Sequence, residues 1–168
     1  SSTTTTLVMG DALAITLLHS RGFSKTDFAL RHPGGSLGRK LLLKAKDLMH
    51  TGDKIPSIQL GATLNEALIE MNHKRLGMTT ITSETKELLG IFTDGDVRRS
   101  LAQPTDIFAI NIDSIMTRKP TTITAETLAT NALSVMNDKK ITTLVITDEK
   151  NQVKGIIHMH DILNSGIF

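Results

Sequence analysis

Two short stretches of the chain have residue types and spacing that suit a phosphorylated ligand. Residues 90–96 read GIFTDGD and residues 155–161 read GIIHMHD, and they align without a gap at an offset of 65 residues. If a strand runs into a helix here, the unpaired N–H groups of the helix N-terminus attract a phosphate. Thr93 would cap that helix and donate a hydroxyl, and Asp96 could accept both hydroxyls of a ribose. Gly90 would leave room for a ligand beside the backbone.

Charged residues follow the first stretch. Arg98 and Arg99 could offset the negative charges of Asp94 and Asp96, and we count Arg98 among the candidate ligand-binding residues. A threonine followed three residues later by an acid is also an ordinary helix start. The first stretch is therefore either a nucleotide-type binding site, which we favour, or a structural turn.

The second stretch keeps the acid, Asp161, but has His158 in place of the threonine. A neutral imidazole can still cap a helix, yet it is bulkier and titrates near neutral pH. We therefore expect two non-equivalent sites, with His158 and His160 accommodating a ligand other than a simple adenosine phosphate. A capping or packing role for His158 is one alternative. A metal site at these histidines is another, but we predict no metal.

The composition excludes several classes of function. The 168 residues are 39% hydrophobic, which suffices for one packed domain or a small domain plus part of another. Without cysteine there is no disulfide, thiolate metal site or cysteine nucleophile. With no Trp or Tyr and only five Phe, the aromatic platforms for nucleic acid are missing, so we expect no nucleic-acid partner. No apolar run suggests a membrane segment, and we expect a cytoplasmic protein.

The N-terminal part predicts helices and a loop. Apolar spacing predicts a helix over residues 6–21, with a Ser/Thr run before it that can supply an N-cap and Gly22 after it. A second helix should start at Ser24, with Asp27 completing a capping box. The glycine-rich stretch at 31–40 predicts a loop, after which helix resumes over 41–48. The chain begins without Met and resembles a piece of a longer protein.

From about Lys46 the chain repeats itself. Matching apolar residues share the 65-residue offset, which indicates a duplicated structural unit. Each copy predicts strand, helix, strand, strand and helix, an α/β (α+β) arrangement whose single copies are too small to close a core. The predicted elements are strands near Ile58 and Ile123, helices over 63–73 and up to Lys139, strands over 78–82 and 143–147, strands over 88–92 and 153–157, and a closing helix at each motif.

This repeat resembles the CBS motif, whose tandem pairs form Bateman modules. The stretches that carry the resemblance are DLM at 47–49, TLNEAL at 63–68, LGMTTI at 76–81, GIFTDGD at 90–96 and HMHD at 158–161. The N-terminal stretches SSTTTTLVMGDALA, RGFSKTDFALRHPGGSLGRKLL and DLMHTGDKIP are similar to the end of a sugar-isomerase (SIS) domain. The whole arrangement resembles bacterial D-arabinose-5-phosphate isomerases. It implies a SIS remnant with linker over 1–45 and CBS motifs over 46–107 and 108–168.

The resemblance implies an aldose–ketose isomerase that interconverts D-ribulose 5-phosphate and D-arabinose 5-phosphate for Kdo and lipopolysaccharide synthesis. It places His32, in the HPGG loop, in the active site, because a histidine tuned near neutrality suits proton transfer or ring opening. The alternative is that His32 only caps the loop before Pro33. The family's catalytic Lys and Glu lie upstream of this chain, so we expect the chain alone to be inactive.

The resemblance also implies ligands and partners. We expect a homo-oligomer, a dimer through the CBS pair and a tetramer in the intact enzyme. No cofactor is required, and the pair is expected to bind a regulatory nucleotide or the sugar nucleotide CMP-Kdo. Two alternatives stay open: an adenine-nucleotide sensor attached to another SIS protein, and an assembly module that binds no ligand.

Overall fold

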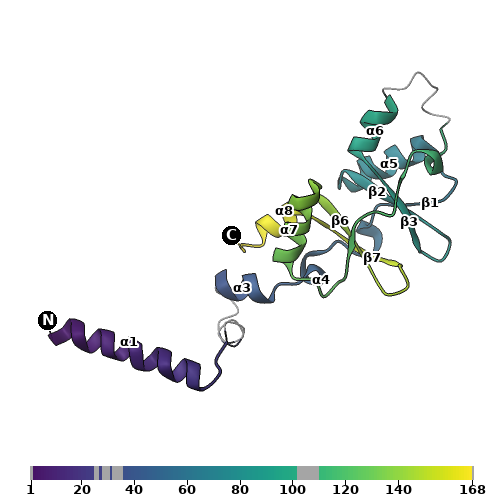
Figure 1. The fold of residues 1–168 in the computed structure, drawn as a ribbon. Coiled ribbons are helices and arrows are strands. Elements are labelled where there is room, and N and C mark those ends of the chain that lie inside the picture. The colour runs from purple at the N-terminus through teal and green to yellow at the C-terminus, as the bar shows by residue number, and fades with distance from the viewer. Residues whose placement is uncertain (1, 25–26, 28–30, 32–35, 102–109, 168) are drawn as a thin grey trace.

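The computed structural model describes the whole chain except residues 1, 25–26, 28–30, 32–35, 102–109 and 168. The N-terminal helix α1 (Ser2–Ser20) extends away from a body that contains two β-sheets (Figure 1). The other elements are α3 (Ser36–Leu42), α4 (Ala45–Leu48), the 3₁₀ helix η1 (Gly52–Lys54), β1 (Ser57–Gln59), α5 (Leu64–Lys74), β2 (Met78–Thr82), β3 (Leu88–Thr93), α6 (Asp94–Leu101), the 3₁₀ helix η3 (Ile112–Ser114), β4 (Thr117–Arg118), β5 (Thr122–Ile123), α7 (Ala129–Lys139), β6 (Thr143–Thr147), β7 (Val153–His158) and α8 (Met159–Asn164).

The sheets confirm the predicted duplication. In the first unit, β1 to β4 with α5 and α6, β1 pairs parallel with β2, and β2 pairs antiparallel with β3. In the second unit, β5 to β7 with α7 and α8, β5–β6 is likewise parallel and β6–β7 antiparallel. The register shift between Ile81 and Thr82 recurs between Ile146 and Thr147. The sequence repeat is therefore a repeat of one folded unit.

Local sequence explains where α5 begins and ends. The Thr63 hydroxyl accepts a hydrogen bond from the Glu66 N–H at 3.3 Å, and the Glu66 carboxylate accepts one from the Thr63 N–H at 2.7 Å. This is the predicted capping box, and it satisfies two N–H groups that the helix itself leaves unpaired. The helix ends at Arg75, which has left-handed backbone dihedrals (φ 59°). Its equivalent Lys140 ends α7 in the same way (φ 55°).

The two units pack through their sheets. Helices α5 and α6 lie on the outer side of one unit and α7 and α8 on the outer side of the other, with the strands between them (Figure 1). A shared core of buried residues lies between the sheets: Met78, Leu88, Val145 and Ile156. Each sheet is therefore covered by its own helices on one face and by the other unit on the second.

The segment that precedes each unit packs into the core of the other unit. Ala45 of α4 is fully buried in the core of the second unit, with Ala129 and Met136 of α7. Ile112 and Met116, which precede the second unit, are instead buried in the core of the first. The two cores are therefore interleaved along the chain, and neither is built from one continuous stretch.

Helix α1 starts earlier than predicted. Ser2 is already helical, so residues 2–6 of the Ser/Thr run lie inside the helix and not before it; the Thr6 hydroxyl donates to the Ser2 carbonyl at 3.0 Å. The predicted helix end at Gly22 is confirmed, because its positive φ (61°) allows its N–H to reach the His19 carbonyl at 3.1 Å. The predicted capping box of Ser24 and Asp27 also forms.

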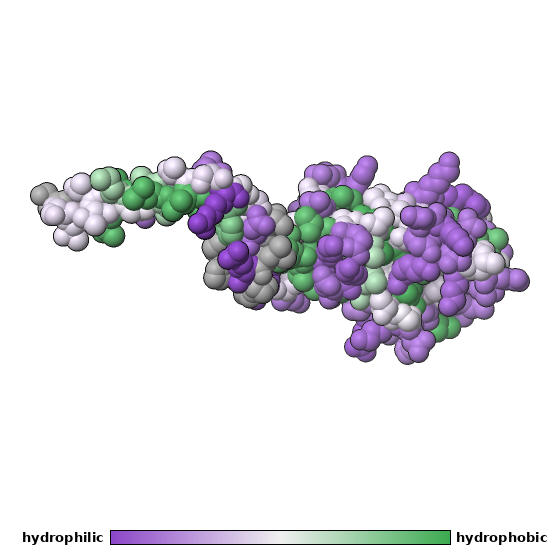
Figure 2. All heavy atoms as spheres, turned by 90° about the horizontal axis from the view of Figure 1, so that it is seen from below, coloured by the Kyte–Doolittle hydropathy of each residue, from purple (hydrophilic) through white to green (hydrophobic). Residues whose placement is uncertain are grey.

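The loop predicted over 31–40 is wrong from Ser36 onward, where α3 begins, and residues 32–35 lie outside the described residues. The helix predicted over 41–48 is broken at Leu43 and Lys44, where the backbone bridges to Leu128 of the second unit. None of the described α1 residues is buried, and Figure 2 shows its hydrophobic side chains at the surface. Among the helices that the structure describes, none is long and apolar enough to span a bilayer.

Candidate functional site: a cleft between the two units

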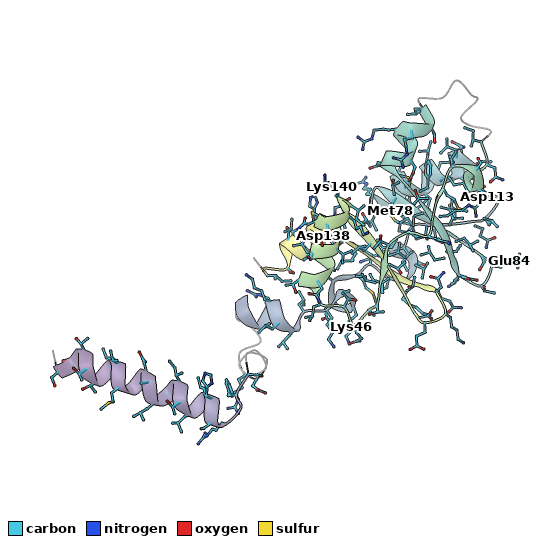
Figure 3. The ribbon with its side chains drawn as sticks, in the orientation of Figure 1. Lys46, Met78, Glu84, Asp113, Asp138 and Lys140 are labelled. Atoms are coloured by element: carbon cyan, nitrogen blue, oxygen red, sulfur yellow. The ribbon has the colours of Figure 1, made fainter. Side chains whose placement is uncertain are left out.

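A cleft of about 580 Å³ lies between the units at the first motif, residues 90–96. The second motif is residues 155–161. The first unit contributes the start of α6, and the second contributes the turn after α7 and the end of β7. Met78 and Lys140, labelled in Figure 3, line it from the two units. Its apolar lining comprises Leu76, Met78, Ile91, Ile141 and Val145, and its polar lining includes Thr93, Asp94, Arg98, Arg99, Thr117, Lys119, Thr121, Lys140, Thr142, Thr143 and His158.

The first motif is the strand-to-helix turn that the sequence predicts. Strand β3 ends at Thr93 and α6 starts at the next residue. The Thr93 hydroxyl accepts a hydrogen bond from the Asp96 N–H at 3.4 Å, and the Asp96 carboxylate accepts one from the Thr93 N–H at 2.8 Å. The predicted capping by Thr93 is confirmed. The eight residues of α6 direct the positive end of its dipole at this side of the cleft.

Asp96 is more enclosed than its predicted role requires. It is 4% exposed, and its side chain is not part of the cleft lining. One carboxylate oxygen accepts from Thr93, and the other accepts from the Thr117 hydroxyl at 3.2 Å and pairs with Arg99. The Arg99 side chain is 70% exposed. A ribose could therefore reach Asp96 only after Arg99 swings away.

The space that we expected Gly90 to leave for a ligand is filled by the protein itself. A Cβ on Gly90 would lie 2.7 Å from Met116 Sδ and 3.0 Å from the Thr117 carbonyl. The space beside this glycine is thus occupied by the protein's own segment, and Gly90 does not line the cleft. A glycine is required here because Met116 packs directly on the strand backbone.

The cleft carries an excess of positive charge. Four cationic side chains line it, Arg98, Arg99, Lys119 and Lys140, against one lining carboxylate, Asp94. Arg99 is paired with Asp96, so three cations face that one carboxylate. Within the described residues, neither lysine has a carboxylate within ion-pairing distance. Both have left-handed backbone dihedrals, φ 54° and 55°. No motif in the sequence marks these lysines. The pairing of β4 with β3 brings Lys119 to the cleft, and the packing of the two units brings Lys140.

The second motif folds in the same way with different chemistry. His158 caps α8 by accepting the His160 N–H on Nδ1 at 3.1 Å, and the Asp161 carboxylate accepts the His158 N–H at 3.0 Å. The same Asp161 oxygen lies 3.0 Å from Nε2 of His50. The rings of His158 and His160 meet edge-on, with centroids 4.8 Å apart. Capping, one of the two alternatives for His158, is therefore what the structure contains.

The environment keeps His158 neutral. Burial lowers the pKa of its imidazole, the charges of His160 and His50 lower it further, and Asp161 opposes them. Because Nδ1 accepts a hydrogen bond, the ring proton is on Nε2. The described residues contain no group of three His, Asp or Glu side chains that could hold a metal ion.

The structure brings only part of the predicted site together. Thr93, Arg98 and His158 line the same cleft. Gly90, Asp96, His160 and Asp161 do not line it. His32 lies outside the described residues.

The comparison with protein families decides what this arrangement is. The model of the CBS domain matches residues 45–103 and 112–166. The chain belongs to the CBS domain family. Its two matches follow the two sequence repeats, so the chain carries a tandem CBS pair, as the resemblance predicted.

Curated relatives extend the similarity to the N-terminal part. The chain is 52% identical over 167 residues to the arabinose 5-phosphate isomerase KdsD of Pseudomonas aeruginosa, with 99% of this chain and 51% of that protein covered. It is 48% identical to the KdsD of Escherichia coli K12 over the same shares. The predicted resemblance to arabinose-5-phosphate isomerases is confirmed, and the chain spans about half the length of these relatives.

Solved structures share the fold of the CBS pair. The CBS domain pair of protein MJ0100, in complex with 5′-methylthioadenosine and S-adenosyl-L-methionine, has a TM-score of 0.66 at 22% identity, covering 74% of this chain and 95% of that chain. CBSX2 in complex with AMP has a TM-score of 0.66 at 14% identity, covering 74% and 96%. At these identities the likeness establishes the predicted fold class alone.

Proposed function

We propose that the cleft between the two CBS units binds an anionic nucleotide and that this binding regulates an arabinose-5-phosphate isomerase. The observation that carries the proposal is the combination of an apolar lining, a helix N-terminus and four cationic side chains in one cleft. Two structural neighbours are complexes with adenine nucleosides or nucleotides. This agrees with a nucleotide-type ligand.

Each part of the cleft has a role in this proposal. A phosphate sits at the N-terminus of α6, beside Thr93, where the guanidinium of Arg98 supplies donors. The base lies against apolar side chains such as Met78 and Ile141, which line the cleft. Lys119 and Lys140 hold a second negative group. A ligand with two anionic groups, such as a nucleoside diphosphate or the phosphate and carboxylate of CMP-Kdo, matches this distribution of charge.

The activity of the complete protein is part of the proposal. We infer that the parent enzyme is an aldose–ketose isomerase acting in the cytoplasm, with His32 in its active site. The hydrophobic side chains exposed on α1, Leu7 and Leu13 among them, fit burial against further sugar-isomerase structure. CBS pairs commonly associate, so we infer a homo-oligomer through the CBS pair.

A thermal-shift screen tests ligand binding. The chain is titrated with AMP, ADP, ATP, CMP and CMP-Kdo. A ligand at 100 times its dissociation constant adds about 2.7 kcal/mol to the free energy of unfolding, which raises Tm by roughly 5–10 °C in a chain of this size. The double variant Lys119→Ala/Lys140→Ala should lose the shift. Lys86→Ala is the matched control, because Lys86 is also an exposed lysine with a left-handed backbone (φ 64°) but lies outside the cleft.

The enclosure of Asp96 favours a second candidate function, an assembly module without a ligand. Its carboxylate oxygens already have protein partners, so no polar group there requires a ligand. If none of the five nucleotides raises Tm at millimolar concentration while the mass of the protein rises with concentration, this second function is the correct one.

A further inference from the structure

The chain enters the CBS pair through residues 43–50, here called the linker strap, and the strap is bound to the second unit. The N–H of Ala45 donates to the Thr127 carbonyl at 2.7 Å, and the Ala129 N–H donates to the Leu43 carbonyl at 2.8 Å. Lys44 and Lys46 both pair with Glu126, at 2.5 and 2.6 Å. These contacts of the strap are therefore with the second unit, although the first unit follows the strap directly in the chain.

The strap ends at the second motif. The N–H of His50 donates to the Ile156 carbonyl at 2.7 Å, and the Ile156 N–H donates back at 3.1 Å. Met49 lies directly on the backbone of Gly155. The side chain of His50 then reaches Asp161, with Nε2 to Oδ2 at 3.0 Å and both side chains a little under a third exposed. The acid of the second motif thus contacts the strap.

The first motif provides the reference for this contact. At the equivalent place Thr117 contacts Asp96, at 3.2 Å. The hydroxyl there is replaced by an imidazole here, a longer and bulkier side chain whose ring N–H can donate to the carboxylate. We propose that the second motif is a latch for the linker strap, in which His50 positions the strap by occupying the Asp161 carboxylate, and that it is not a second ligand site.

The remaining substitutions in the second motif agree with a latch. Leu163 and Asn164 stand where the first motif has Arg98 and Arg99, so the cations that would attract an anion are absent. Helix α8 has six residues against eight in α6. His160, where the first motif has Gly95, adds a ring that packs on His158.

The latch makes the strap and the second unit one body. Any upstream structure continues from α3, whose Arg39 side chain donates to the carbonyl of Gly166 at 3.2 Å, also in the second unit. This inference goes beyond the proposed function, because it requires no ligand.

Hydrogen–deuterium exchange of the chain tests the latch. The variant His50→Leu removes the side-chain donor, while His50→Gln keeps an N–H group near the position of Nε2. Thr117→Val is the matched control, because it removes the equivalent contact in the first unit. The amides of the strap are compared with those of β2, which reports whether the variant is folded.

The expected result is specific to the strap. In His50→Leu the amides of His50 and Ile156 exchange about five to ten times faster than in the wild type, which is the effect of losing one partly exposed charged hydrogen bond. His50→Gln restores most of the protection, and Thr117→Val leaves the strap unchanged. Unchanged exchange in His50→Leu, equal acceleration in His50→Gln, or equal acceleration in Thr117→Val would overturn the proposal.

Discussion

Replacing Gly155 by alanine tests whether the stability of the fold depends on the packing of the linker strap, which precedes the first unit, against the second unit. A Cβ at Gly155 would lie 2.6 Å from Met49 Sδ, 3.0 Å from Met49 Cγ and 2.9 Å from the His50 carbonyl oxygen. Favourable contacts between such atoms lie about 3.5–4.0 Å apart. The new methyl group therefore overlaps both a side chain and the backbone of the strap.

The size of the effect follows from what can move. The thioether of Met49 can rotate away, but the His50 carbonyl is held by the Ile156 N–H at 3.1 Å. Relief of the overlap thus requires the loss of a strap hydrogen bond. Inserting a methyl group into a filled site costs about 1–3 kcal/mol, and the fixed carbonyl places Gly155→Ala at roughly 2–3 kcal/mol. In a chain of this length this lowers Tm by about 5–10 °C.

Urea denaturation and thermal melting of Gly155→Ala, Met49→Ala, their double variant and Gly95→Ala measure this. Gly95→Ala is the control, since its nearest neighbours would lie 3.5 Å away and alanine favours the helix. It should melt at or above the wild-type temperature. Adding Met49→Ala to Gly155→Ala should cost less than the sum of the single changes, because the sulfur contact is then relieved. If Gly155→Ala melts within about 1 °C of the wild type, the strap does not pack on Gly155, and the conclusion that the two cores are interleaved is wrong.

Three further predictions test other features. Thr63→Ala should lower the free energy of unfolding by about 1 kcal/mol in urea, because α5 loses its capping box; an unchanged midpoint would contradict this. Hydrogen bonds from Lys44 and Lys46 lower the pKa of Glu126 from 4.5 to about 2, so this carboxylate stabilises the fold above pH 4.5 and the contribution fades as the pH falls towards 2. Glu126→Gln should therefore flatten the pH dependence of Tm in that window, and a curve parallel to the wild type would refute it. Calorimetric titration with any nucleotide that raises Tm should give one molecule per chain, since the second motif is a latch; two would count against the latch.

Elements encoded by neighbouring residues were predictable. Three predictions of this kind are confirmed: the capping box of Thr63 and Glu66, the helix end at Gly22, and the strands over 78–82 and 143–147. In each case the signal lies within a few residues, as a side chain that caps a nearby N–H or as a run of strand-forming side chains. The predicted starts of α1 and α3 were too late, because Ser/Thr and glycine residues that favour turns lie inside these helices.

The sequence by itself determined the repeat, the two motifs and the family, because these depend on residue order and spacing alone. The tertiary structure decided what each motif contacts. Gly90 and Gly155 accommodate methionines that come from the segments preceding the other unit. Lys140 meets Thr93 only across the interface of the units, and Lys119 reaches the cleft because β4 pairs with β3. No local pattern encodes such contacts, because the partner residues meet only when the segment preceding each unit packs into the core of the other unit.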